Sequence, residues 1–401
     1  MNSATLSQLH REQLTAEYRL KAQRCPGSCV RGPAIVVGPS PPPHNGMTLA
    51  IELTLAALND DLSVVHLDTA DRRGLSNIGR FEFGNLLLAA KHGLTFLWLL
   101  LTKRPRIVYV PVSQAWLPFL RDCLFLVPAR LFRRRVVIHL HGGSFGRFYR
   151  QSSPLMRWII RFALGKARCA IVLGKNVVDA FDGVLPREMI RIVPNGIPDA
   201  FADRAPERSK GAEMQAPVLL YLSTLVAEKG FLDLLMALPK VRKRAGNVRT
   251  VVAGEWCSER DRETALQLIE RAGLENVVEF TGPVGPERKR ELLANADALV
   301  LPTYNEGHPY VILEAMSAGL PIISTNVACI PETVRDGVEG FLIDSGDIDA
   351  LADRIGQLLT NGSLRKEMGK NSRRRFLEQY TYEKFAERME SVFEEVIVGT
   401  R

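Results

Sequence analysis

Residues 301–322 read LPTYNEGHPYVILEAMSAGLPI, and this stretch decides the fold of the 401-residue chain. The apolar run Ala298–Leu301 predicts a buried strand, which continues into a loop that contains Gly307. A helix is predicted to follow, with Glu314 in its second turn. Strand, glycine-bearing loop and helix in this order are typical of one unit of an α/β sheet. Glu306 therefore lies at the loop tip and Glu314 just inside the helix.

The rest of the chain repeats strand and helix patterns in two rounds, which predicts two doubly wound parallel sheets. Strands are predicted at 34–37, 64–67, 107–110, 136–140, 170–173 and 191–193, and then at 218–223, 250–253, 277–280, 298–301 and 321–324. The expected division is a polar N-terminal tail (1–31), an N-terminal domain (32–200), a linker rich in proline and charge (201–216), a C-terminal domain (217–380) and a C-terminal helix (381–401). A length of 401 residues suits two domains of ordinary size.

The two carboxylates have the chemistry of a nucleotide-sugar site. Backbone amides of Gly307, His308 and Tyr310 are predicted at or near a helix N-terminus, where unpaired donors favour an anion such as a diphosphate. Glu314 can accept two hydrogen bonds from the hydroxyls of a ribose, and Glu306 can accept those of a sugar. Acids at a helix start also complement the helix dipole without any ligand. The pair alone therefore leaves both interpretations open.

The segment 306–325, EGHPYVILEAMSAGLPIIST, resembles the signature of the retaining glycosyltransferase family four, whose members have the GT-B fold. The segments 294–302 and 330–342 resemble the residues that precede and follow that signature, and the resemblance covers about 33–395. It implies an α/β fold of two Rossmann-like domains that face a cleft. The N-terminal domain would bind the acceptor, the C-terminal domain would bind the donor, and the last helix, 382–398, would reach back toward the first domain.

The resemblance also implies the site residues. Lys229 would stabilise the departing diphosphate, and the catalytic group would consist of Lys229, Glu306 and His141, the last at the end of the strand 136–140. The donor-binding residues would be Gly46, Thr224, Lys229, Glu306, Gly307, His308, Pro309, Tyr310 and Glu314. Thr224 stands where the family usually has arginine, so either another basic residue substitutes for it or diphosphate binding is weaker. His139 shares a strand face with His141 and has the alternative of being a hydrogen-bonded core residue.

The expected reaction is transfer of a hexose-type sugar from a nucleotide-diphosphate sugar with retention of configuration. The resemblance favours front-face displacement, in which the departing phosphate takes the proton of the acceptor hydroxyl. No cofactor beyond the donor and no metal are expected, because no Asp-X-Asp motif adjoins the site. Two alternatives remain open at this point: a GT-B sugar-nucleotide epimerase, which needs no acceptor, and a non-catalytic glycosyltransferase-like partner subunit, which the departure at Thr224 suggests.

Charge is divided unevenly along the chain and indicates the partners. The net charge is +13 over residues 1–200 and −5 over residues 201–401. The basic runs 103–106 and 133–135 flank apolar stretches at 94–101 and 117–127, a composition typical of an element that lies on an anionic membrane. The alternative is that both stretches are core helices. Nucleic acid is the third possibility for the basic half, but no recognisable motif accompanies the charge, so no nucleic-acid partner is predicted.

Localisation is predicted from the absence of targeting signals. Residues 1–31 lack the apolar core of a secretory signal, the six cysteines are scattered, and no uninterrupted apolar run reaches the length of a membrane span. We therefore expect a cytoplasmic protein that is peripheral at the inner face of the cytoplasmic membrane and acts on a saccharide or lipid-linked saccharide acceptor in polysaccharide or glycoconjugate assembly.

Overall fold

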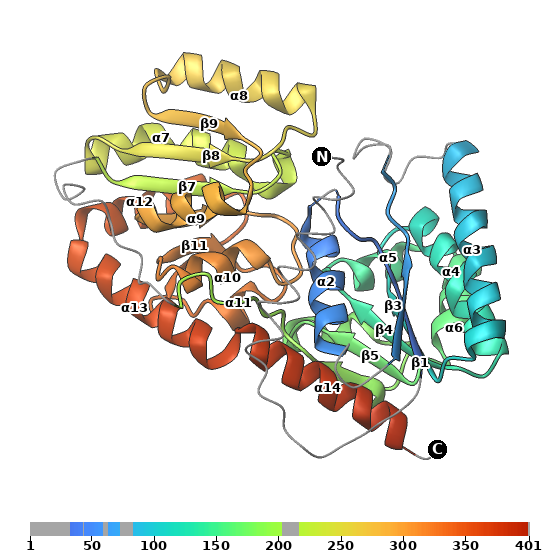
Figure 1. Ribbon diagram of the computed structural model, residues 1–401. Coiled ribbons are helices and arrows are strands. Elements are labelled where there is room, and N and C mark those ends of the chain that lie inside the picture. The colour runs from blue at the N-terminus through green and yellow to red at the C-terminus, as the bar shows by residue number, and fades with distance from the viewer. Residues whose placement is uncertain (1–32, 43, 59–62, 73–82, 203–215, 400–401) are drawn as a thin grey trace, which may run out of the picture.

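The computed structural model describes residues 33–42, 44–58, 63–72, 83–202 and 216–399. They form two α/β domains, each built on a six-stranded sheet, with the C-terminal helix running along the base of the N-terminal domain (Figure 1). The predicted tail and most of the predicted linker lie outside the described residues. Every strand pair in both sheets is parallel, as the strand and helix alternation predicts.

The N-terminal sheet has the strand order β2-β1-β3-β4-β5-β6. Its strands are β1 (Pro33–Gly38), β2 (Ser63–Asp68), β3 (Ile107–Pro111), β4 (Arg135–Leu140), β5 (Cys169–Val172) and β6 (Ile190–Ile192). Its helices are α2 (Gly46–Leu58), α3 (Phe83–Lys103), α4 (Trp116–Leu131), α5 (Phe145–Gln151) and α6 (Pro154–Leu164), with short 3₁₀ helices η2 (Lys175–Phe181) and η3 (Arg187–Met189). β3 and β4 are almost wholly buried, as expected for apolar strands covered on both faces.

The C-terminal sheet has the strand order β12-β11-β10-β7-β8-β9. Its strands are β7 (Val218–Leu222), β8 (Arg249–Ala253), β9 (Val278–Gly282), β10 (Ala298–Leu301), β11 (Ile322–Thr325) and β12 (Gly340–Ile343). Its helices are η5 (Ala227–Lys229), α7 (Phe231–Ala245), α8 (Glu259–Ala272), α9 (Pro286–Asn295), α10 (Tyr310–Ser317), α11 (Ile330–Thr333), α12 (Ile348–Thr360) and α13 (Gly362–Gln379). The eleven strands predicted from the sequence are present within one or two residues, and β12 is the strand that was missed.

The last helix, α14 (Tyr382–Val398), belongs to the C-terminal segment but packs on the N-terminal domain. Phe393 of this helix lies beside Tyr109 of β3, with ring centroids 6.2 Å apart. The Arg191 guanidinium of β6 pairs with the carboxylate of Glu395. Arg135 of β4 donates to the carbonyl oxygens of the last helical turn, including that of Val396 at 2.8 Å. One continuous apolar core consequently runs from the inner face of the first sheet through α2 and α14 into the second domain.

Candidate functional site

The centre of the site is an ion pair between Lys229 and Glu306. Lys229 ends the turn η5 after β7, and Glu306 lies in the loop after β10, so both follow the carboxyl ends of neighbouring strands, where open α/β sheets bind ligands. Lys229 Nζ lies 2.6 Å from Glu306 Oε1 and 3.0 Å from the carbonyl oxygen of Asn305. The two side chains are 23% and 17% exposed, so both remain reachable from solvent.

Gly230 explains why Lys229 points into this position. Its φ is +74°, and a Cβ there would lie 1.9 Å from the carbonyl oxygen of Pro302. Only glycine adopts this left-handed conformation with so close a backbone neighbour. The turn therefore holds the Lys229 backbone directly against the strand exit that leads to Glu306.

The second carboxylate, Glu314, lies in α10 and also has a lysine partner. Lys289 of α9 places Nζ 2.5 Å from Glu314 Oε1, and the two side chains are 30% and 16% exposed. This lysine was not predicted, because its approach to Glu314 depends on how α9 packs beside α10. The site thus holds two Lys–Glu pairs. Lys289 places beside the predicted donor contacts a positive charge that Thr224 does not supply.

Two helices begin beside each other across the cleft. Gly46 is the first residue of α2 and Tyr310 the first of α10, and a Cβ at Gly46 would lie 3.7 Å from the Tyr310 ring. The Asn45 side chain caps α2 by accepting from the amides of Met47 and Thr48, both at 3.0 Å. These contacts are those of an N-cap. Two helix N-termini directed at one place favour a bound anion.

The loops of the two domains approach each other closely at glycines. A Cβ at Gly307 would lie 2.4 Å from the carbonyl oxygen of His141, and a Cβ at Gly143 would lie 2.5 Å from that of Glu306. Ser144 Oγ and Asn305 Oδ1 lie 2.8 Å apart across the same junction. The glycines permit backbone contact between the domains, and so His141 is brought to the loop that carries Glu306.

His141 belongs to a buried polar group that also contains Tyr109 and His139. The Tyr109 hydroxyl lies 2.7 Å from His139 Nδ1 and 3.2 Å from His141 Nε2, and the two imidazole rings lie 3.8 Å apart. Burial lowers the pKa of His141 to about 4 and that of His139 well below its usual value of 6.5. Both rings are neutral at pH 7, and His139 is the buried, hydrogen-bonded core residue that the sequence left as one alternative.

His308 was predicted as a donor-binding residue, and the structure places its ring in the interface between the domains. His308 Nδ1 accepts from the Asn195 amide at 2.9 Å, and Asn195 Nδ2 donates to the His308 carbonyl oxygen at 2.8 Å. Burial lowers the His308 pKa to about 3, so the ring is neutral and acts as an acceptor. Asn195 is therefore a partner of the signature segment.

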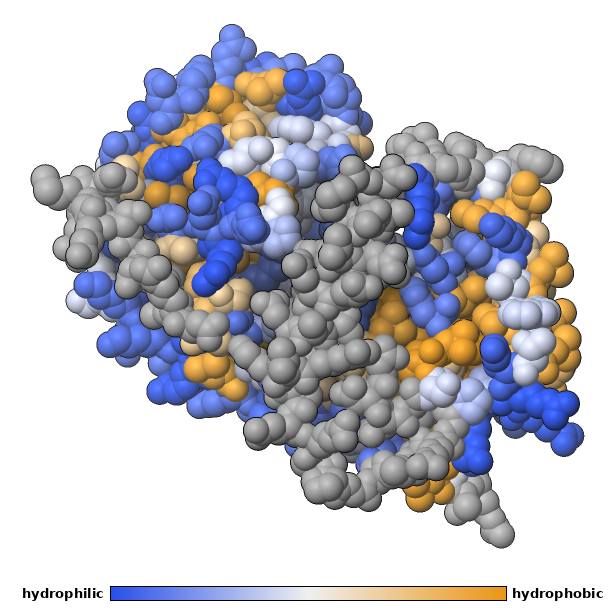
Figure 2. Space-filling view, in the orientation of Figure 1, coloured by the Kyte–Doolittle hydropathy of each residue, from blue (hydrophilic) through white to orange (hydrophobic). Residues whose placement is uncertain are grey.

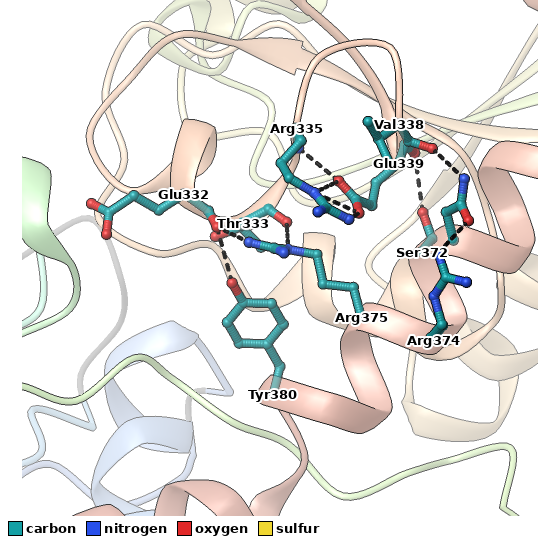
Figure 3. Close-up of polar contacts among 10 residues, drawn as sticks. Glu332, Thr333, Arg335, Val338, Glu339, Ser372, Arg374, Arg375 and Tyr380 are labelled. Carbon is teal, nitrogen blue, oxygen red and sulfur yellow. Dashed lines mark hydrogen bonds and ion pairs between the residues drawn. The ribbon is translucent and has the colours of Figure 1, made fainter.

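A second contact joins the domains at Glu332, in the segment that follows the signature. Its carboxylate accepts from the amides of Lys175 and Asn176 in the N-terminal domain at 2.8 and 2.7 Å. Figure 3 shows how the C-terminal domain fixes this segment, since Arg375 and Tyr380 donate to its backbone carbonyl oxygens, including that of Glu332 at 2.6 and 3.1 Å. The contact ties the segment that follows the signature to the N-terminal domain.

The remaining predicted residues divide into two groups. Pro309 is the N-cap residue of α10, and the Tyr310 hydroxyl is buried with no hydrogen-bond partner among the described residues. Thr224 is exposed in the loop after β7, and its carbonyl oxygen accepts from the Val226 amide. Within the described part of the chain no side-chain hydrogen bond assigns Thr224 a role, so its donor contact stays a prediction.

Comparison with known proteins identifies the family. Residues 203–375 match the family described as glycosyl transferases group 1. The C-terminal domain therefore carries the signature of this family. The chain is 27% identical over 284 residues to the N-acetyl-alpha-D-glucosaminyl L-malate synthase of Bacillus anthracis, a match that covers 69% of this chain and 72% of the relative. It is 30% identical over 217 residues to a GDP-mannose-dependent phosphatidylinositol monomannoside mannosyltransferase of Mycobacterium tuberculosis, covering 51% of this chain and 55% of the relative.

The fold is shared with solved structures of GT-B glycosyltransferases. The structure of Anabaena HepE in complex with UDP and glucose superposes with a TM-score of 0.71 at 19% identity, covering 91% of this chain and all of that one. The predicted family and the predicted GT-B fold are both confirmed. This glycosyltransferase therefore has the architecture in which two domains face one cleft, and the residues described above lie at that cleft.

Proposed function

We propose that this glycosyltransferase transfers a hexose-type sugar, with retention of configuration and without a metal, from a nucleotide-diphosphate sugar to a hydroxyl of a lipid-linked saccharide. The observation that carries the proposal is the Lys229–Glu306 pair beside the start of α10. The Lys229 ammonium stabilises the negative charge that develops on a diphosphate at the helix N-termini as the glycosyl bond breaks. Glu306 and His141 orient the sugar, and Glu314 accepts from the ribose.

Lys289 completes the donor site in this proposal. A cation 2.5 Å from Glu314 supplies positive charge beside the ribose, where Thr224 supplies none. Glu314 keeps a second carboxylate oxygen, which can accept a ribose hydroxyl while the ion pair persists. Lys229 at the diphosphate and Lys289 at the ribose end together support an active enzyme over a non-catalytic partner subunit.

The test is an assay of donor consumption with and without a saccharide acceptor, with the anomeric configuration of the product determined by NMR. The proposal predicts acceptor-dependent release of nucleoside diphosphate, a retained configuration and full activity in EDTA. An isomerised nucleotide sugar formed from donor alone would instead identify an epimerase. Inversion of configuration, or loss of activity in EDTA that added metal restores, would overturn the corresponding part of the proposal.

The lipid-linked acceptor is supported by an exposed apolar surface on the N-terminal domain. The adjacent helices α3, α4 and α6 carry stripes of large apolar side chains at helical spacing that face away from the core. The exposed members are Leu86, Leu87, Leu94, Trp98 and Leu101 of α3, Trp116, Leu120, Leu124 and Leu131 of α4, and Leu155, Trp158 and Phe162 of α6. We call this set the outer face. Orange surface on the α3 side of the domain is visible in Figure 2. An exposed apolar area of this extent is typical of an interaction site.

Basic residues border the outer face and make an anionic lipid surface its proposed partner. Lys103 ends α3, Arg104 follows it, and Arg133 lies just after α4, all of them exposed. Of the run 133–135, Arg135 instead donates to the end of α14 and so has a structural role. Exposed tryptophans beside arginines and lysines are the composition of an element that lies at the level of lipid headgroups.

Helix α3 corrects the expectation that no apolar run reaches the length of a membrane span. Its window Gly84–Lys103 is long and apolar enough to do so by length and composition, and only 22% of that window is buried. The sequence count missed it because Lys91 and His92 interrupt the apolar run. On its inner side Phe96 and Leu100 are wholly buried against the domain. We propose that α3 lies along the membrane while packed on its own domain, with the protein peripheral at the cytoplasmic side.

Co-sedimentation with vesicles tests the membrane contact. The combined variant Leu94→Ser, Trp98→Ser and Leu101→Ser removes apolar side-chain surface that membrane binding would bury. We therefore expect about a tenfold lower partition coefficient on vesicles rich in phosphatidylglycerol. Leu266→Ser is the control, because Leu266 is similarly exposed on α8 of the other domain. Equal binding by the triple variant and the wild type would contradict the proposed surface, as would the absence of any wild-type preference for anionic vesicles.

A further inference from the structure

The site contains one hydrogen-bonding group that its proposed mechanism does not use, the hydroxyl of Tyr109. It lies in the middle of β3 with 0% exposure, between the imidazole rings of His139 and His141. His141 Nδ1 and His139 Nε2, the two ring nitrogens that do not face Tyr109, are buried and have no partner among the described residues. Tyr109 is therefore the group that links the protonation of the two rings, and its hydroxyl also has the Thr54 hydroxyl as a neighbour.

A hydroxyl has one proton, so it cannot donate to both rings. In one arrangement Tyr109 donates to His139 Nδ1 and accepts from a protonated His141 Nε2. In the other it donates to His141 Nε2 and accepts from a protonated His139 Nδ1. The two arrangements leave His141 Nδ1 as an acceptor or as a donor, respectively, and these are opposite properties for a group that meets a sugar hydroxyl.

The distances favour the first arrangement. The contact of the Tyr109 oxygen is 2.7 Å to His139 and 3.2 Å to His141. Hydrogen bonds donated by hydroxyl groups are shorter than those donated by N–H groups, with preferred lengths near 2.7–2.8 Å and 2.9–3.0 Å. The short contact is thus the one in which Tyr109 donates, and the longer contact is the one in which the His141 ring donates.

We propose that Tyr109 is a positioning residue that, with His139, fixes His141 in the Nε2-protonated form, so that His141 Nδ1 presents a lone pair to a hydroxyl of the donor sugar. This inference rests on the proposed function for the part that concerns the sugar, and on geometry alone for the tautomer. Tyr109 and His139 touch neither substrate in this account. They act through the orientation and the proton of the His141 ring.

The tautomer is measured directly by long-range ¹H–¹⁵N correlation NMR on protein labelled with ¹⁵N-histidine, with the His141 signals assigned from a His141→Gln variant. We expect the Nε2-protonated form of His141 in the wild type. In His139→Leu the Tyr109 proton loses its ring acceptor on that side, and His141 Nε2 and the neighbouring Thr54 hydroxyl are the acceptors that remain, so we expect the tautomer to shift toward Nδ1 protonation. His139→Asn keeps an acceptor beside Tyr109 and retains the wild-type tautomer.

Activity supplies a second readout. Tyr109→Phe keeps the buried ring and removes the hydroxyl, and we expect kcat to fall about tenfold while the donor KM changes less than about twofold, since most of the proposed nucleotide contacts lie in the C-terminal domain. Tyr149→Phe is the matched control, because the Tyr149 hydroxyl donates to the Gly183 carbonyl oxygen on the same domain.

A wild-type His141 protonated on Nδ1, or an unchanged tautomer in both His139→Leu and Tyr109→Phe, would overturn the proposal. The NMR result needs no turnover, so the tautomer can be as proposed while the enzyme transfers no sugar. In that outcome the proposed function fails, and the assignment of the His141 tautomer to Tyr109 and His139 stands.

Discussion

Both domains are built on a six-stranded parallel sheet, but the two halves of the chain carry net charges of opposite sign. Residues 1–200 carry a net charge of +13 and expose the outer face, whereas residues 201–401 carry −5 and hold the paired carboxylates of Glu306 and Glu314. Most of the proposed donor residues of the C-terminal domain lie in one short segment, 302–322, to which Lys229 and Lys289 come from elsewhere in the chain. The proposed membrane surface is instead spread over three helices. In this proposal one fold combines a largely local nucleotide site with a partner surface that only folding assembles.

The largest effect is expected when a positive charge is removed from the proposed donor site in the C-terminal domain. Lys229→Ala should lower kcat/KM by on the order of 10²-fold or more, because one contact that stabilises transition-state charge is lost. The control is Lys240→Ala, whose ammonium pairs with Asp349 on the surface of the same domain. Near-normal turnover in Lys229→Ala would show that the C-terminal site is not the site of chemistry.

A pH dependence of stability tests the contact between the domains at His308. Its pKa is about 3 in the folded protein and near 6.5 when unfolded, so the unfolded chain binds the extra proton between these values. Stability is fully present above pH 6.5 and falls as the pH is lowered through this window. At pH 5 the loss from one such histidine is about 2 kcal/mol.

The measurement is the free energy of unfolding from urea titrations at pH 7 and pH 5. His308→Gln removes this titration, so its loss of stability between the two pH values should be smaller than that of the wild type by about 2 kcal/mol. His141 and His139 contribute equally to both proteins and cancel in the comparison. Identical losses in wild type and variant would refute a buried neutral His308.

A smaller effect is expected where the loops of the two domains meet. Gly307→Ala places a Cβ 2.4 Å from the His141 carbonyl oxygen, so the loops must separate and His141 moves away from Glu306. We expect kcat/KM to fall about tenfold from this misplacement. Gly285→Ala is the control, since a Cβ there meets nothing within 4 Å. Equal activity in both variants would show that the domains need not touch here during the reaction.

Local sequence predicted most of the fold. Apolar runs located eleven strands, and the pattern 382–398 matched α14 to the residue, because the periodicity of buried side chains is a local property. β12 was missed since it is only four residues long and begins at Gly340. A glycine is needed there because a Cβ would lie 1.8 Å from the Ile322 carbonyl oxygen of the neighbouring strand, which is information about packing.

The site was predictable where it follows a motif and not where distant segments meet. The signature placed Glu306, Glu314 and Lys229 correctly relative to strands and helices. Lys289 and Tyr109 have no local signal, since Lys289 is 25 residues from Glu314, and Tyr109 is 32 from His141. The sequence likewise could not decide whether the apolar side chains of the outer face are exposed, because an apolar helix has the same composition in a core as on a surface.

The central claim is that the Glu306 and Glu314 segment binds a nucleotide-diphosphate sugar, and a thermal-shift panel of UDP, GDP and ADP with their sugars tests it most directly. The account predicts that one nucleotide series raises the melting temperature of the wild type, by stabilisation of about 2.7 kcal/mol at a concentration of 100 Kd. Glu314→Gln should lose most of that rise at the same concentration. No shift with any nucleotide, or a full shift in Glu314→Gln, would contradict the claim.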